Sequence, residues 1–316
     1  MWFLRERAIF PITTLIKPPH ISSRSLAVLA GISLVSPAFA VVNIDYVSVG
    51  NASNAADPAT DSLYGAVSYA YNIGKYEVTN AQYAQFLNAK GASNSNGIFS
   101  SSMASYDITQ TGSSGSFSYN VTSGFENKPV VYVSWFDAAR FTNWLGNGQG
   151  SGDMETGAYT LNGATSGIFT VNSGGKVYLP SEDEWYKVAY YNGDTASYSL
   201  YAHGQNSITT ADANYDGSVG ASTDVGSYPD TNFYGTFDQG GNVWEYNDAV
   251  IASERGLRGG SWASNDSNLA SSERNSFPPS AGSNIDVGFR VASVPEPTSL
   301  LLTMLASGVM LIRRKR

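Results

Sequence analysis

The chain has 316 residues, which allows one large domain or two ordinary ones, and it carries 18 lysine and arginine residues against 26 aspartate and glutamate residues. With a formal net charge of −8 and no basic stripe that could neutralise phosphates, nucleic acid is not an expected partner. Cysteine is absent, which excludes disulfides, thiolate metal sites and thiol nucleophiles.

The first 40 residues have the organisation of a secretory signal peptide. Basic residues precede an apolar run at residues 26–35, and Ala38-Phe39-Ala40 forms an A-x-A cleavage site. Ten apolar residues are too few to span a bilayer, which argues against a membrane anchor. We therefore expect signal peptidase to release a mature, exported chain that begins near Val41.

Residues 294–316 form a second processing signal. A Pro-Glu-Pro motif at 295–297 is followed by an apolar run at 298–312 and by four basic residues. The run is just long enough to enter a membrane, and the basic end stays on the cytoplasmic side. This order resembles the PEP-CTERM sorting signal of Gram-negative bacteria, which an exosortase is expected to cut near the Pro-Glu-Pro. The resemblance implies transient anchoring in the inner membrane before transfer to the envelope or the extracellular space, with a plain tail anchor as the alternative.

Short strands and loops make up much of the expected mature chain. Alternation of apolar and polar residues predicts a strand at residues 41–50 and a hairpin within 66–78, and apolar runs predict strands at 129–133 and 177–179. The Ser/Gly/Asn-rich residues 91–126 predict long loops and short hairpins rather than an interdomain linker. Because strands and helices do not alternate regularly, a doubly wound parallel sheet is not expected.

Three helices are expected, each beginning at a capping box in which a hydroxyl residue precedes an acceptor by three positions. The boxes are Thr79 with Gln82, Ser134 with Asp137, and Ser181 with Glu184. Apolar residues at helical spacing define the inward faces. These residues are Tyr83, Phe86 and Leu87; then Ala138, Phe141 and Leu145 in a helix that ends at Gly146; and Trp185, Val188 and Ala189.

The stretch 234–248, YGTFDQGGNVWEYND, is interpreted as a loop that could hold a ligand. Gly240-Gly241 allows positive φ and a close approach of the backbone to another group. Asp238 and Glu245 flank the glycines, so two carboxylates and the intervening carbonyls could converge on one calcium ion. The alternative is a surface turn beside a buried Trp244.

Residues 212–217, DANYDG, are a second candidate cation loop. Oxygen-bearing side chains at alternate positions followed by glycine match the first half of an EF-hand loop. Thr223 stands where the bidentate glutamate should be, so an EF-hand is not expected. A calcium site of another geometry and an Asx-rich turn both remain open.

Seven motifs occur in an order that resembles the formylglycine-generating enzyme, or sulfatase-modifying factor, family. They are GKYEVTN at 74–80; the group PV, VSW and DA within 129–138; the pair LPSE and EW within 179–185; VGSY at 225–228; GNVWE at 241–245; RGGSW at 258–262; and GFR at 288–290. The match covers about residues 41–292. It implies a single irregular, loop-rich α+β domain at residues 41–293, with a fold related to C-type lectins and only a few short helices.

Carried over residue by residue, the resemblance implies two structural calcium sites. The ligands of the first would be the side chains of Asp238 and Glu245 and the carbonyls of Gly241 and Val243. The ligands of the second would be the side chains of Asn214 and Asp216 and the carbonyls of Tyr215 and Ser218. The second loop is shorter than is usual in the family.

The catalytic pair of the family is missing. In oxidising members, two cysteines downstream of the Gly-Gly-Ser-aromatic motif bind copper and carry out oxygen chemistry, and here Ser264 and Leu269 hold these positions. A serine hydroxyl does not bind copper(I) as a soft thiolate does, so neither copper nor the known formylglycine-generating activity is expected. A Ser-His-Asp triad would have to use His203, and no G-x-S-x-G motif surrounds any serine.

The leading hypothesis is a calcium-stabilised, non-catalytic binding module exported to the envelope or extracellular matrix. Tyrosine, tryptophan and asparagine in long loops could stack on and hydrogen-bond to sugars, so exopolysaccharide is the first ligand to test. The alternative is an enzyme of the same family with another oxidative or hydrolytic chemistry. Paired carboxylates, Asp238 with Glu245 or Glu182 with Glu184, could in principle serve glycoside hydrolysis.

Overall fold

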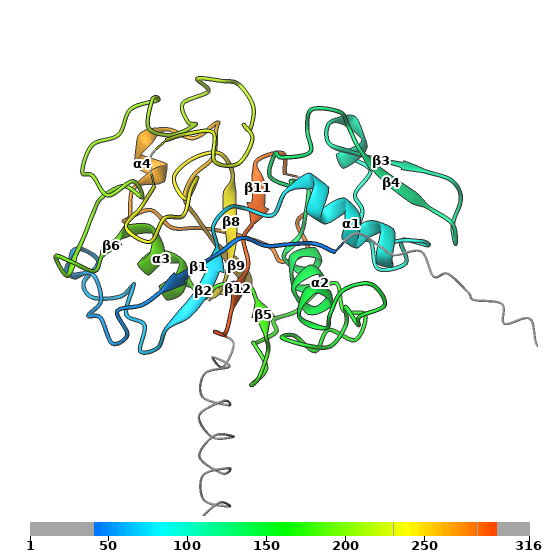
Figure 1. Cartoon of the computed structure of the whole chain (residues 1–316), viewed down its shortest axis with the longest axis horizontal. Coiled ribbons are helices and arrows are strands. Elements are labelled where there is room, and N and C mark those ends of the chain that lie inside the picture. Colours follow the sequence, from blue (N-terminus) through cyan, green and yellow to red (C-terminus); the bar gives the residue numbers. More distant parts are fainter. Residues whose placement is uncertain (1–40, 230, 283, 296–316) are drawn as a thin grey trace, which may run out of the picture. The chain divides into compact units, whose positions relative to one another are not determined.

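The computed structural model describes residues 41–229, 231–282 and 284–295. The expected signal peptide and sorting tail, residues 1–40 and 296–316, therefore lie outside the described residues. None of the described helices is long and apolar enough to cross a membrane. The described chain forms two four-stranded sheets, two small hairpins and three main helices connected by long loops (Figure 1), which confirms the irregular α+β fold predicted from the sequence.

The first sheet joins the beginning of the described chain to its end. Its spatial order is β1 (Tyr46–Val49), β2 (Tyr71–Gly74), β12 (Ala292–Ser293) and β5 (Val177–Tyr178). All three pairings are antiparallel. Because β12 lies between β2 and β5, the sheet closes only when the last described residues are in place.

The second sheet carries the longest strand. Its order is β10 (Asn275–Phe277), β9 (Glu254–Arg258), β8 (Trp244–Ile251) and β11 (Val287–Phe289). The first two pairings are antiparallel, whereas β11 runs parallel to β8 and places Val287 opposite Trp244. The remaining strands form the hairpins β3 (Ile108–Thr111) with β4 (Ser118–Val121) and β6 (Tyr191–Asn192) with β7 (Ser197–Tyr198).

The main helices are α1 (Asn80–Lys90), α2 (Trp135–Gly146) and α3 (Glu182–Tyr190), and a single turn, α4 (Asp266–Leu269), follows β9. The predicted capping boxes at Thr79, Ser134 and Ser181 are all present, with both reciprocal hydrogen bonds. Two 3-10 turns complete the regular structure, η1 (Pro58–Thr60) and η2 (Met103–Ser105).

An aromatic cluster packs α1 and α2 against β11. Phe141 of α2 stacks on Tyr83 of α1 at 6.0 Å between ring centroids and meets Phe289 of β11 edge-on at 5.6 Å. Phe86 and Trp144 complete the contact at 5.3 Å. These side chains are buried, so the helix faces predicted from apolar spacing form part of the core.

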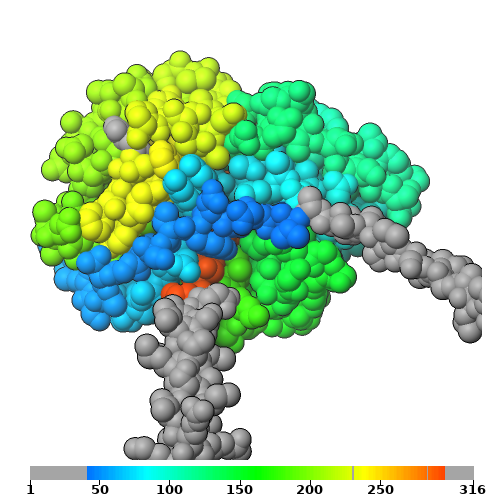
Figure 2. All heavy atoms as spheres, viewed as in Figure 1, coloured from blue at the N-terminus to red at the C-terminus, as the bar shows by residue number. Residues whose placement is uncertain are grey.

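The first described segment crosses one face of the domain, where it is visible as a blue band (Figure 2). The Val42 N–H donates to Gln149 Oε1 at 2.7 Å. Further along, Asn51 Oδ1 accepts a hydrogen bond from the Tyr234 hydroxyl at 3.1 Å. The segment thus contacts two regions that are distant from each other in sequence.

Three expectations about strands are wrong. Residues 66–78 contain only β2, whose partners β1 and β12 lie elsewhere in the chain, so no hairpin forms there. Residues 129–133 contribute one isolated bridge, between Pro129 and Thr79, instead of a strand. The loop predicted at 234–248 ends early, because β8 begins at Trp244 and is paired on both sides by distant strands.

Candidate functional site

The Gly-Gly loop, which we define as residues 238–243, is a crossing point of several segments. The Gly241 N–H donates to Gly259 O at 2.9 Å, and the Asn242 N–H donates to Asn214 O at 2.9 Å. Gly241 has φ +83°, and a Cβ built on it would lie 2.3 Å from Asn214 O. Only glycine fits this position, because any side chain would be strained and would also displace a carbonyl.

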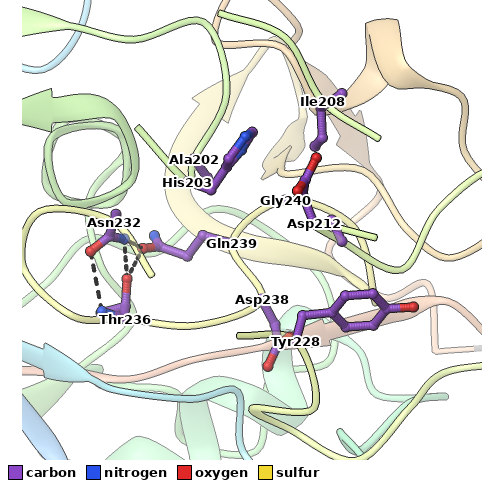
Figure 3. Close-up of a pocket in the computed structure, with 11 residues that line it drawn as sticks. Ala202, His203, Ile208, Asp212, Tyr228, Asn232, Thr236, Asp238, Gln239 and Gly240 are labelled. Carbon is purple, nitrogen blue, oxygen red and sulfur yellow. Dashed lines mark hydrogen bonds between the residues drawn. The ribbon is translucent and has the colours of Figure 1, made fainter. Parts of the chain in front are cut away.

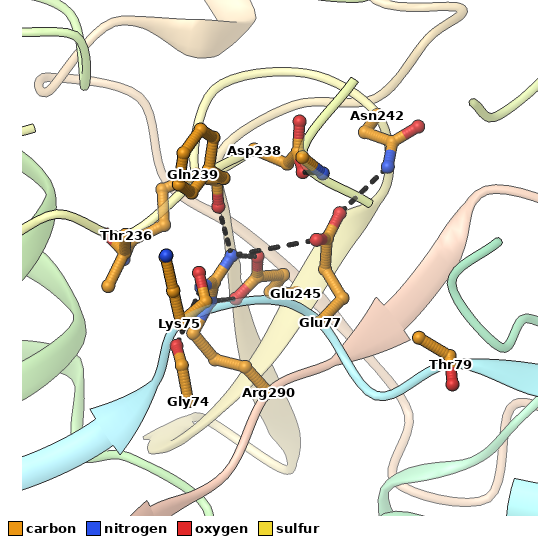
Figure 4. A network of polar contacts seen from close by, with 12 residues as sticks. Gly74, Lys75, Glu77, Thr79, Thr236, Asp238, Gln239, Asn242, Glu245 and Arg290 are labelled. Carbon is orange, nitrogen blue, oxygen red and sulfur yellow. Dashed lines mark hydrogen bonds and ion pairs between the residues drawn. The ribbon is translucent and has the colours of Figure 1, made fainter. Parts of the chain in front are cut away.

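A buried ion pair lies beneath this loop (Figure 4). Glu245 of β8 accepts hydrogen bonds from Arg290 Nε at 2.6 Å and from Arg290 Nη2 at 2.5 Å, and its Oε2 also accepts from Trp185 Nε1 at 2.7 Å. Arg290 further donates to Gly74 O at 3.0 Å and to Phe237 O at 2.9 Å. Both charged side chains are fully buried, so the attraction between them offsets the free energy that each loses when it is removed from water.

Two more carboxylates leave this cluster short of positive charge. Glu77 is buried; its Oε1 accepts from Asn242 Nδ2 at 2.9 Å, whereas its Oε2 has no hydrogen-bond partner and lies 4.0 Å from Arg290 Nη2. Asp238 is half-buried and accepts from the Gly226 N–H at 2.6 Å.

Burial and the Asp238 carboxylate raise the pKa of Glu77 well above its usual range, and burial raises the pKa of Asp238 to about 6. Three carboxylates face one guanidinium, so a proton or a cation is needed for balance.

The first predicted calcium site is part of this cluster. The carbonyls of Gly241 and Val243 accept no hydrogen bond from the described part of the chain, and Glu245 keeps one lone pair beyond its three hydrogen bonds. No group of three acidic or histidine side chains among the described residues is arranged to hold a metal. A calcium ion here would therefore need the carbonyls together with Asp238 and Glu245, and the charge of the cluster fits a divalent cation.

The second predicted calcium loop contains an unpaired buried oxygen. Asn214 is buried, and its Nδ2 donates to Ala221 O at 2.9 Å, but its Oδ1 has no partner. Asp216 is exposed at φ 56°, and the Tyr215 carbonyl accepts the Ser218 N–H at 3.1 Å in a turn. The unpaired Asn214 Oδ1 and the carboxylate of Asp216, two residues further along the chain, are oxygen ligands of the kind that calcium prefers.

One residue that was given no role from the sequence connects the two loops. Asn242 donates its N–H to Asn214 O and its Nδ2 to Glu77 Oε1, and its Oδ1 accepts from the Thr223 N–H at 2.9 Å. It has φ 57°, a region that asparagine tolerates better than most residues. The motifs GKYEVTN, GNVWE and GFR contain Glu77, Asn242 and Arg290, respectively. The sequence therefore pointed to these three residues but did not predict that they contact one another.

The positions of the family's cysteines are filled differently here. Leu269 is fully buried in an apolar cluster, and a Cβ built on Gly260 would lie 2.5 Å from its Cδ1. Ser264 Oγ accepts from the Ser261 N–H at 3.0 Å, and Ser261 Oγ donates to Asp286 Oδ2 at 2.9 Å. One position is therefore core packing and the other belongs to a hydroxyl network.

The other candidate catalytic groups have structural contacts. Glu182 accepts from Arg258 Nε at 2.9 Å and from Arg274 Nη2 at 2.6 Å, and Glu184 caps α3. His203 lines a cavity of about 20 Å³ with Asp238 (Figure 3), enough for about one water molecule. Within the described residues no hydrogen bond joins His203 to a serine, so the structure gives no support to a triad.

Replacement of Gly241 by alanine should destabilise the protein much more than the same replacement at Gly235. Both glycines have φ near +84°, but a Cβ on Gly235 meets nothing within 4 Å, whereas on Gly241 it meets Asn214 O at 2.3 Å. Backbone strain should cost about 1–2 kcal/mol in each variant. Overpacking should cost Gly241→Ala about 1–3 kcal/mol more. Urea unfolding measures both, and equal losses would show that the contact with Asn214 imposes no constraint.

Glu245→Gln should cost about 3–5 kcal/mol of unfolding free energy even in the presence of a chelator, because Arg290 then keeps a buried charge without its counterion. Glu126→Gln is the matched control, since Glu126 is exposed and a surface change of this kind stays within about 0.5 kcal/mol. Chemical unfolding of both variants gives the comparison. A small effect of Glu245→Gln without calcium would mean that the ion pair contributes little to the native state.

Comparisons with known proteins agree with the fold described above. Residues 46–294 match the model of the sulfatase-modifying factor enzyme 1-like domain. The structure resembles Treponema denticola variable protein 1, with a TM-score of 0.55 and 23% identity over 80% of this chain and 96% of that one. It also resembles the crystal structure of CarF, with a TM-score of 0.54 and 22% identity over 81% of this chain and 100% of that one. No curated protein matches. The chain belongs to the sulfatase-modifying factor enzyme 1-like domain family and has the C-type-lectin-like fold of the formylglycine-generating enzymes.

Proposed function

We propose that the protein is an exported, non-catalytic binding module that calcium stabilises and that binds exopolysaccharide of the envelope or matrix. The observation that carries the proposal is the state of the family's catalytic positions. Leu269 is fully buried in the core, Ser264 hydrogen-bonds to Ser261, and the sequence contains no cysteine. A scaffold that keeps the family's fold without its thiolates is better suited to binding than to oxygen chemistry.

Calcium would act as a structural ion at the two loops. Asp238 and Glu245 with the carbonyls of Gly241 and Val243 would hold one ion, and the charge deficit around Arg290 supports this assignment. Asn214 and Asp216 with the carbonyls of Tyr215 and Ser218 would hold the other, supported by the unpaired Asn214 Oδ1. Copper has no place in this proposal because the thiolates that bind it in the family are missing.

Calcium should raise the melting temperature of the wild-type protein relative to chelator. A ligand at a hundredfold excess over its Kd contributes about 2.7 kcal/mol per site, which corresponds to roughly 5–10 °C for a domain of this size. Asp238→Asn should lose most of the shift from the first site, whereas Asp224→Asn, at an exposed aspartate, should keep it. The remaining shift would belong to Asn214 and Asp216.

Metal analysis of the purified protein decides between the module and an enzyme. Calcium without a redox metal supports the module, whereas a stoichiometric redox metal would favour an oxidative enzyme. No calcium-dependent shift under reversible conditions would remove the metal assignment at both loops. If exopolysaccharide from the producing cells does not retain the protein, exopolysaccharide is not its ligand.

Export predicts a mature protein shorter than the sequence at both ends. Signal peptidase should leave Val41 as the first residue, and an exosortase should remove the apolar tail near residues 295–297. Intact mass spectrometry of protein from a host with an exosortase measures both cuts, with a host lacking the enzyme as the control. If the apolar tail persists in both hosts, residues 294–316 are a simple membrane anchor and not a sorting signal.

A further inference from the structure

A groove of about 430 Å³ lies between the β6–β7 hairpin, the loop at residues 199–206 and the segment at 231–233, and none of Glu77, Asp238 and Glu245 lines it. Its volume is within the range of about 300–1,000 Å³ that is usual for small-molecule sites. None of the motifs that identify the family contributes to its lining, so neither the resemblance nor the proposed calcium sites explain it.

The walls of the groove are held by hydrogen bonds within each loop. In the hairpin, Asn192 Oδ1 accepts the N–H groups of Asp194 at 2.9 Å and Thr195 at 3.3 Å, which closes the turn. In the next loop, Asn206 Oδ1 accepts the Leu200 N–H at 2.9 Å. Loops fixed in this way lose little conformational freedom when a ligand binds, so more of the contact energy appears as affinity.

The lining combines aromatic rings with neutral hydrogen-bonding groups. Tyr191 and Tyr198 face each other across the hairpin, 5.0 Å apart, and Phe233 contributes a ring whose residue is 41% exposed. Gln205 is exposed and makes no side-chain hydrogen bond to the described residues, and an amide offers both donors and an acceptor. Aromatic faces beside amides and hydroxyls match the alternating C–H and hydroxyl surfaces of a sugar ring.

Charge decides which class of sugar fits. No aspartate, glutamate, lysine or arginine is among the described residues that line the groove, and His203 is its only imidazole. Residues 41–295 carry 24 acidic against 10 basic residues, so the domain is strongly negative. A polyanionic glycan would find no cation in the groove and would be repelled by the rest of the domain.

We infer that this groove binds a neutral oligosaccharide segment, with Phe233 as a stacking surface and the amide of Gln205 as a partner for sugar hydroxyls. The inference rests on the proposed function and adds to it the binding site and the charge class of the glycan. No bond is made or broken, and no metal is needed at the groove.

Electrophoresis of the full chain in native gels tests the inference. One set of gels contains a neutral polysaccharide (galactomannan, β-1,3-glucan or dextran), and another contains polygalacturonate. The wild type should be retarded in at least one neutral gel and not by polygalacturonate. Phe233→Ala and Gln205→Ala should each weaken retardation, Phe233→Ala by about tenfold in affinity because a central aromatic contact is lost. Tyr106→Ala is the control, since Tyr106 is 50% exposed and does not line the groove.

Each outcome has a distinct meaning. Retardation of the wild type that both groove variants lose and Tyr106→Ala keeps supports the inference, provided that all variants melt near the wild-type temperature. If Phe233→Ala fails to fold, Gln205→Ala carries the test alone. If the groove variants are retarded as strongly as the wild type, the polysaccharide binds at another site, which overturns the inference but not the proposed function. Retardation by polygalacturonate alone overturns the neutral groove but not polysaccharide binding, and no retardation in any gel overturns both.

Discussion

The ion pair between Arg290 and Glu245 is the constraint on which the rest of the structure depends. Arg290 lies between β11, a strand of the second sheet, and β12, a strand of the first, and it donates to Gly74 at the end of β2. Its side chain thus joins both sheets to each other and to the carbonyl of Phe237, the residue before the Gly-Gly loop. A buried pair of this kind is weak evidence for added stability, because desolvation offsets the attraction between the charges. Its guanidinium donates to acceptors on three separate segments, at Gly74, Phe237 and Glu245, so the pair holds these segments in one arrangement.

The same pair explains why the carboxylates beside it need a proton or a cation for charge balance. Glu77 and Asp238 add two carboxylates that Arg290 cannot also neutralise, and Glu77 Oε2 is left without a hydrogen bond. Proteins resolve such an excess by protonation or by binding a positive ion. Asn242 connects this excess to the unpaired Asn214 Oδ1, so an ion at either loop would order the backbone that both share. Cation binding and folding are therefore coupled through one asparagine in this proposal.

A feature could be predicted from the sequence when its interacting residues lie close together along the chain, and it could not when they lie far apart. The helices were predictable because a capping box places both partners within three positions, as Ser134 and Asp137 show. Strands were less predictable because their partners are distant: β2 was expected to pair within a hairpin, yet it pairs with β12 at the far end of the domain. The proposed calcium ligands Asp238 and Asn214 came from local spacing and family resemblance, and they stay a prediction. The contacts of Glu77 with Asn242 and of Arg290 with Gly74 span 165 and 216 residues, and no local pattern indicates them.

Leu269, at one of the two positions that the family resemblance assigns to cysteine, has a packing role in this chain. Leu269 is enclosed by Tyr201, Ala213 and Tyr215 and lies against Gly260, so a smaller and more polar side chain there would leave a cavity in a satellite core. Replacing Leu269 by cysteine would therefore destabilise α4 and the residues packed against it. At the groove beside the β6–β7 hairpin, Phe233 and Gln205 meet no such conflict, because both are exposed and neither belongs to a core cluster. Substitutions at Phe233 and Gln205 can therefore change the proposed ligand contacts without disturbing the buried ion pair that holds the two sheets together.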